Sequence, residues 1–128
     1  MWKRKPKEWH PDDILPGMLA RNQLIWDQLK ALGVTEETPL RLEFFYDSAG
    51  GENDQQLAEH LRSTTDYDVK VGHSESYGVT GWTQPGKGSP EALNAWVAAM
   101  VHAGYENGRC TFDGWGAPVP EGVEPPQG

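Results

Sequence analysis

The stretch SPEALNAWVAAMVHAGY, residues 89–105, constrains the fold more than any other part of the chain. Ser89 suits the N-cap of a helix, Pro90 suits its first position, and Gly104 suits its end. Between them, apolar residues recur at the spacing i, i+3, i+4, i+7, i+8, which is typical of an amphipathic helix. These residues are Leu93, Trp96, Val97, Met100 and Val101.

The remaining patterns predict one more helix before a strand, and then an alternation of strands and helices. Apolar stripes predict helices over 18–32 and within 48–63, and alternating residues predict strands over 39–47, 67–71, 77–83 and 109–115. After the first helix, the order is β-α-β-β-α-β. With right-handed crossovers, this order indicates an α+β fold of the ferredoxin-like type with an additional N-terminal helix. Both later helices then pack on one face of a four-stranded antiparallel sheet, whose first and third strands lie at its centre.

Length and composition indicate a single domain. The 128 residues suit one core, which we expect over 17–119, between a basic, Pro-rich arm (1–16) and a Pro/Gly-rich tail (120–128). No apolar run approaches the ~20 residues of a membrane span, and the basic N-terminus lacks the apolar segment of a signal peptide. The only cysteine, Cys110, excludes an intrachain disulfide and suits a reducing compartment. We therefore expect a cytoplasmic protein.

The net charge of −8 bears on the choice of partner. An acidic surface repels phosphate backbones and attracts basic proteins, although charge also serves plain solubility. Ferredoxin-like RNA-binding modules stack bases on exposed sheet aromatics, but here acids surround the candidate aromatics and the RNP1 pattern is missing. We therefore expect no direct contact with nucleic acid. The acids concerned are Glu43, Asp47, Asp68 and Asp113.

No pattern of catalytic, metal-binding or cofactor-binding residues is present. The four histidines lack the spacing of metal ligands, and no G-x-S-x-G, G-x-G-x-x-G or Walker A motif occurs. We therefore predict no enzyme activity, no metal and no cofactor. A small hydrolase that uses Asp113 or His73 is the rival interpretation, and it requires these two side chains to lie within hydrogen-bonding reach in a deep pocket.

We expect a protein-binding surface on the sheet face that points away from the helices. Aromatic residues mixed with acids, and glycines at the end of the last strand, suggest it. The candidate residues are Phe45, Trp82, Asp113, Gly114, Trp115 and Gly116. Trp115 has two interpretations, since glycines beside an aromatic residue suit either a core plug or an exposed side chain on a bent strand. The occupant of the surface is a foreign protein or a second copy of the chain.

Several segments together resemble the RraB family, the regulators of ribonuclease E activity B. The similarity covers about residues 40–119 and is sharpest in the helix over 89–105 and in the Asp-Gly-Trp-Gly motif at 113–116. It implies a ferredoxin-like domain that binds an RNA-degrading endoribonuclease of the ribonuclease E type and inhibits it without a cofactor. The chain lacks the strongly acidic tails of the family. An orphan protein-binding module, such as an immunity or antitoxin-like protein, is the alternative.

Overall fold

Three helices and six strands make up the part of the chain that the computed structural model describes, residues 9–72 and 77–125. The predicted α+β class and antiparallel pairing are confirmed. In chain order the elements are α1 (Pro11–Ala31), β1 (Pro39–Leu40), β2 (Glu43–Asp47), α2 (Gly51–Thr64), β3 (Asp68–Val71), β4 (Tyr77–Trp82), β5 (Gly86–Lys87), α3 (Pro90–Glu106) and β6 (Phe112–Gly116).

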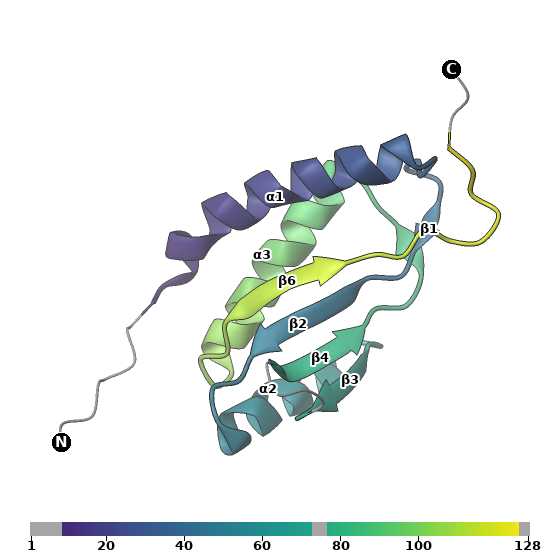
Figure 1. Cartoon of the computed structure of the whole chain (residues 1–128). Helices are drawn as coiled ribbons and strands as arrows, with labels where there is room; N and C mark the ends of the chain where they lie inside the picture. Colours follow the sequence, from purple (N-terminus) through teal and green to yellow (C-terminus); the bar gives the residue numbers. More distant parts are fainter. Residues whose placement is uncertain (1–8, 73–76, 126–128) are drawn as a thin grey trace.

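The main sheet has the strand order β3-β4-β2-β6, so β2 and β4 lie at its centre (Figure 1). The stretch predicted as one strand over 39–47 is in fact two strands, because β1 pairs with β5 in a separate two-stranded sheet. At the break, Leu42 accepts a hydrogen bond from the backbone N–H of Thr83 (2.8 Å) and donates its own N–H to the Thr83 hydroxyl (3.0 Å). The Thr83 side chain thus replaces a regular ladder bond where the chain leaves the main sheet.

Helices α2 and α3 cover one face of the main sheet, and α1 packs against α3 (Figure 1). We call the covered face the inner face and the opposite one the outer face. The predicted cap of α3 is confirmed, since the Ser89 hydroxyl accepts the N–H of Ala92 (3.1 Å). Within the described ranges, no helix has both the length and the apolar character required to cross a membrane. The largest fully buried side chains are Phe44, Tyr46, Phe112, Leu57 and Leu61.

Helix α1 begins earlier than the expected residue 18, so residues 11–16 of the predicted arm belong to the helix. The helix starts at Pro11, with His10 as its N-cap. The His10 imidazole accepts the N–H of Asp12 (3.2 Å), and Asp13 accepts the N–H of His10 (2.9 Å), which forms a capping box. Pro16 lies inside the helix, which continues through it and forgoes one backbone bond.

The segment after β6 has no helix or strand up to residue 125, as its composition predicts. It nevertheless packs against the domain, because Val119 and Val123 lie on the core. A β-carbon placed on Gly33, at the end of α1, would lie 2.0 Å from the carbonyl oxygen of Glu124. Val123 and Glu124 therefore lie closely against the C-terminal end of α1.

A bulge in β6 directs Trp115 into the core. Phe112 pairs with Tyr46 and Trp115 pairs with Phe44, with a register shift between the two pairs. Phe112 and Trp115 are three residues apart and would face opposite ways in a regular strand, but the extra residue of the bulge turns both inward. Gly114 takes φ = +148° at this point, a value that favours glycine. Trp115 is only 8% exposed, so its interpretation as a core residue is confirmed.

We expect Trp115→Ala to destabilise the domain by ~3–5 kcal/mol, because it removes a buried aromatic side chain. Trp82→Ala on the outer face is the matched control and should cost no more than ~1 kcal/mol. Urea unfolding followed by circular dichroism measures both free energies. A Trp115→Ala variant that unfolds at the same urea concentration as the parent would contradict the packing described here.

Candidate protein interface on the outer face of the sheet

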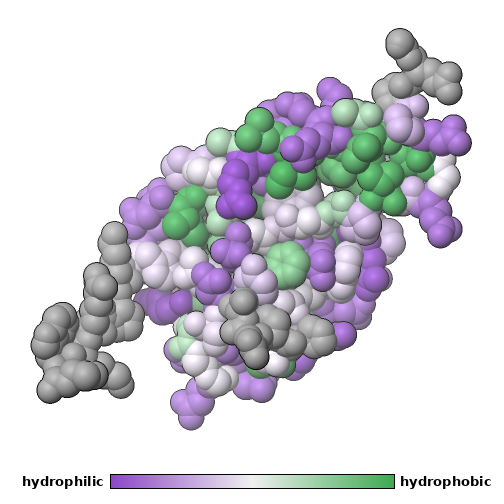
Figure 2. Space-filling model, viewed as in Figure 1, coloured by the Kyte–Doolittle hydropathy of each residue, from purple (hydrophilic) through white to green (hydrophobic). Residues whose placement is uncertain are grey.

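The outer face exposes aromatic side chains from its two central strands. Phe45 and Tyr77 lie with their ring centroids 5.1 Å apart, and Trp82 lies at the far end of β4. All three are half-buried rather than covered. In Figure 2 the side chains over the strands are mainly hydrophilic with single apolar residues among them, and larger apolar patches follow α1. The outer face therefore combines a few aromatic side chains with polar surroundings, as transient interfaces do.

Arg41 holds one end of this face in a fixed arrangement. Its guanidinium carbon lies 5.0 Å from the centre of the Trp82 ring, and its Nη2 lies 2.6 Å from a carboxylate oxygen of Asp68. Its Nε donates to the backbone oxygen of Thr83 (3.2 Å). Arg41 compensates Asp68 here, and Glu43, which pairs with Trp82 across the strands, adds one carboxylate at this end.

The opposite end of the face is acidic. Burial, and then the charge of Asp113, raise the pKa of Asp47. A hydrogen bond with Asp113, and then the charges of Asp113 and Asp47, raise the pKa of Tyr77. This end would favour a cationic group of a binding partner.

Two glycines leave the β6 side of this face without side chains. Gly114 lies opposite Phe45 and Gly116 lies opposite Glu43. A β-carbon on Gly114 would meet only Arg21, at 3.9 Å, and one on Gly116 would meet nothing within 4 Å. A partner backbone could therefore approach Phe45 closely from this side.

The structure brings five of the six predicted site residues to the outer face and its strand ends. These are Phe45, Trp82, Asp113, Gly114 and Gly116. The expectation that Trp115 could lie there as well is wrong, because the bulge turns it to the inner face. Its indole N–H donates to Oδ1 of Asn22 (2.8 Å), and its ring meets that of Trp96 edge to face, with centroids 6.3 Å apart.

The described residues do not include the Asp113–His73 pair that the rival hydrolase interpretation requires. His73 lies outside the described residues, and Asp113 is engaged by Tyr77. Cys110 is buried, and burial, followed by the charge of Asp54, raises its pKa to about 12, which keeps the thiol protonated. In the part of the chain that the structure describes, no three His, Cys, Asp or Glu side chains are grouped so that they could hold a metal ion.

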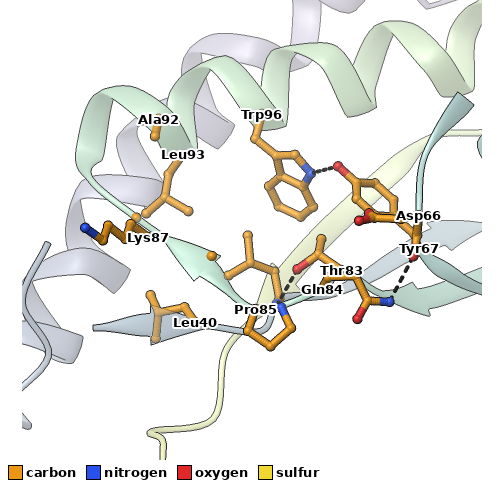
Figure 3. Close-up of a pocket in the computed structure, with 13 residues that line it drawn as sticks. Leu40, Asp66, Tyr67, Thr83, Gln84, Pro85, Lys87, Ala92, Leu93 and Trp96 are labelled. Carbon is orange, nitrogen blue, oxygen red and sulfur yellow. Dashed lines mark hydrogen bonds between the residues drawn. The ribbon is translucent and has the colours of Figure 1, made fainter. Parts of the chain in front are cut away.

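A hollow of about 340 Å³ was not predicted from the sequence (Figure 3). It lies between the N-terminal half of α3, the β1–β5 pair and the segment that leads into β3. The sequence places Trp96 only in the apolar stripe of its helix, and Tyr67 only in a strand. Since the residues that line the hollow come from separate segments, a stripe pattern in one segment could not reveal it.

We expect Asp113→Asn to lower the pKa of both Asp47 and Tyr77, because it removes the charge that raises them. The pKa of Asp47 should stay above its ordinary 3.8, since burial is the larger cause. A raised folded-state pKa means that stability falls as pH rises from that ordinary value through the folded one, and Asp113→Asn should reduce this fall. Carboxyl-carbon NMR titration measures the pKa of Asp47. Asp68→Asn, at the Arg41 end, is the control, and an unchanged Asp47 pKa in Asp113→Asn would contradict the arrangement.

Comparison with known proteins assigns the chain to no family. No protein-family model matches it, and no curated protein is significantly similar to it. The function is therefore argued from the surface of the domain itself.

Proposed function

We propose that the protein is a non-catalytic regulator that binds and modulates a partner protein through the outer face of its sheet. The observation that carries the proposal is the group of Phe45, Tyr77 and Trp82, which no described helix covers. The carboxylates of Asp47 and Asp113 lie at its Tyr77 end. Aromatic side chains within a polar rim are typical of protein interfaces. Glycines on β6 leave one side of this group open to close approach.

The partner in this proposal is an RNA-degrading endoribonuclease of the ribonuclease E type, and the outcome is its inhibition. The resemblance to the RraB family supports this choice, since the Asp113–Gly116 motif follows α3 and ends the last strand. RNA-binding surfaces are basic, because their affinity comes from neutralised phosphates. An acidic face on a chain of net charge −8 complements such a surface and would compete with RNA for it. The same charge opposes direct RNA binding by this protein.

The arrangement of the domain supports the same assignment. The strand order β3-β4-β2-β6, with α2 and α3 on one face, is the one expected of a ferredoxin-like domain, to which α1 is added. A cytoplasmic location completes the proposal, because RNA degradation takes place there and the single cysteine needs no oxidising compartment.

The alternative partner is a basic toxin, in which case the protein is an immunity or antitoxin-like module. The acidic end of the outer face fits this alternative equally well in charge. A second copy of the chain would meet its own carboxylates across a twofold axis, which disfavours a homodimer through this end. A small hydrolase is disfavoured as well, because Asp113 already interacts with Tyr77.

Capture from the native cell distinguishes these partners. The full chain is immobilised and the retained proteins are identified by mass spectrometry. Recovery of an endoribonuclease, whose cleavage of RNA then slows when the pure protein is added, supports the proposal. Recovery of a toxin in its place, or an endoribonuclease whose activity does not change, would contradict it.

We expect Phe45→Ala to weaken binding of the captured partner by at least ~2 kcal/mol, because it removes a central aromatic contact. Leu24→Ala is the matched control, since Leu24 is 63% exposed on α1, away from the sheet face. Isothermal titration calorimetry measures both affinities, and thermal unfolding verifies that both variants are folded. Equal losses in the two variants would place the interface elsewhere.

A further inference from the structure

The hollow beside α3 has walls that hydrogen bonds between distant segments hold in place. The indole N–H of Trp96 donates to the hydroxyl of Tyr67 (3.0 Å), which joins α3 to the segment before β3. The side-chain amide of Gln84 donates to the backbone oxygen of Asp66 (2.9 Å), and Thr83 is bonded to Leu42. The hollow is thus formed before any ligand arrives, as binding pockets usually are.

The walls are largely apolar, and no described side chain of the protein fills the space between them. Leu40, Pro85, Leu93 and the ring of Trp96 surround it in Figure 3. Its volume of about 340 Å³ lies at the lower end of the range for ligand pockets. Protein interiors are otherwise closely packed, so an open apolar hollow of this size favours an apolar occupant. A flat aromatic ring suits walls that are themselves partly aromatic.

Two hydroxyl groups that line the hollow call for a polar group on its occupant. The Tyr67 and Thr83 hydroxyls each accept an N–H, and within the described residues neither donates its own proton. Thr83 is only 6% exposed, so water has little access to its hydroxyl. The occupant should therefore carry a hydrogen-bond acceptor next to its ring.

We infer that this hollow binds an aromatic side chain of the partner protein, with a backbone carbonyl of the same segment accepting from Tyr67. The choice of a protein segment rests on the proposed function and on continuity with the outer face. Arg41 connects the two surfaces, because it stacks on Trp82 and donates to the backbone of Thr83, which lines the hollow. A segment that crosses the face at Trp82 thus reaches the hollow around Arg41.

Titration of the ¹⁵N-labelled full chain with N-acetyl-tryptophanamide tests the site without any partner. We expect saturable shifts of the Trp96 indole signal and of the Tyr67 and Thr83 amides, with a Kd of roughly 1 mM for so small a probe. N-acetyl-leucinamide and indole should each bind several-fold more weakly, since the first lacks the ring and the second lacks the carbonyl. Indole binding as tight as that of N-acetyl-tryptophanamide would overturn the inference in favour of a small aromatic ligand. The absence of saturable shifts would overturn it entirely.

Two substitutions on the same helix provide matched variants. Ala92→Phe places a ring at the rim of the hollow and should weaken binding of the probe about tenfold or more. Ala99→Phe lies on an exposed part of α3 outside the hollow and should leave binding of the probe unchanged. Equal binding to both variants would overturn the site. Tyr67→Phe should weaken N-acetyl-tryptophanamide but leave indole unchanged, and an equal effect on both probes would overturn the role of the carbonyl.

These outcomes separate the hollow from the proposed function. If N-acetyl-tryptophanamide fails to bind while Phe45→Ala still weakens binding of the captured endoribonuclease, then the inference is wrong and the proposed function stands. If the probe binds as expected but no endoribonuclease is captured, then the hollow stands and the assignment of its partner is wrong.

Discussion

The bulge in β6 is the constraint on which both faces of the sheet depend. By adding one residue at Asp113–Gly114, it brings Phe112 and Trp115 to the same side, where both pack under the central strand. It also leaves Asp113, Gly114 and Gly116 on the outer face. A regular strand would expose one of the two aromatic rings and lose part of the core. The packing of the inner face and the composition of the outer one therefore have a single local cause.

A buried polar contact connects this strand to the helices. Asn22 is only 1% exposed, and it accepts the indole N–H of Trp115 while donating to Asn94 on α3 (3.0 Å). Tyr46 similarly donates from its buried hydroxyl to the backbone oxygen of Met100 (2.7 Å). Among the described residues, no buried side-chain nitrogen or oxygen lacks a hydrogen-bond partner. Such fully satisfied contacts specify one arrangement of α1, α3 and the sheet, because any shift would leave a buried polar group unpaired.

The two candidate binding surfaces follow from the same architecture. Since α2 and α3 cover only the inner face, the aromatic residues of the outer face remain available to a partner. The break between β1 and β2 then turns the chain away from the main sheet and forms one wall of the hollow beside α3. Arg41 lies at this break and contacts both surfaces. In the proposed function, the acidic end of the outer face and the apolar hollow select different features of one partner.

The sequence by itself determined the local elements and the character of the surface. Helical spacing identified α3 with its Ser89 cap, strand alternation separated Phe44 from Phe45, and the charge count showed an acidic chain. These features depend on neighbours within a few residues, which a pattern can show. Tertiary structure alone decided that Trp115 faces inward. One inserted residue reverses which face of the strand each later side chain points to. Tertiary structure alone assembled the hollow as well, since Leu40, Tyr67 and Trp96 are far apart in the chain and only packing brings them together.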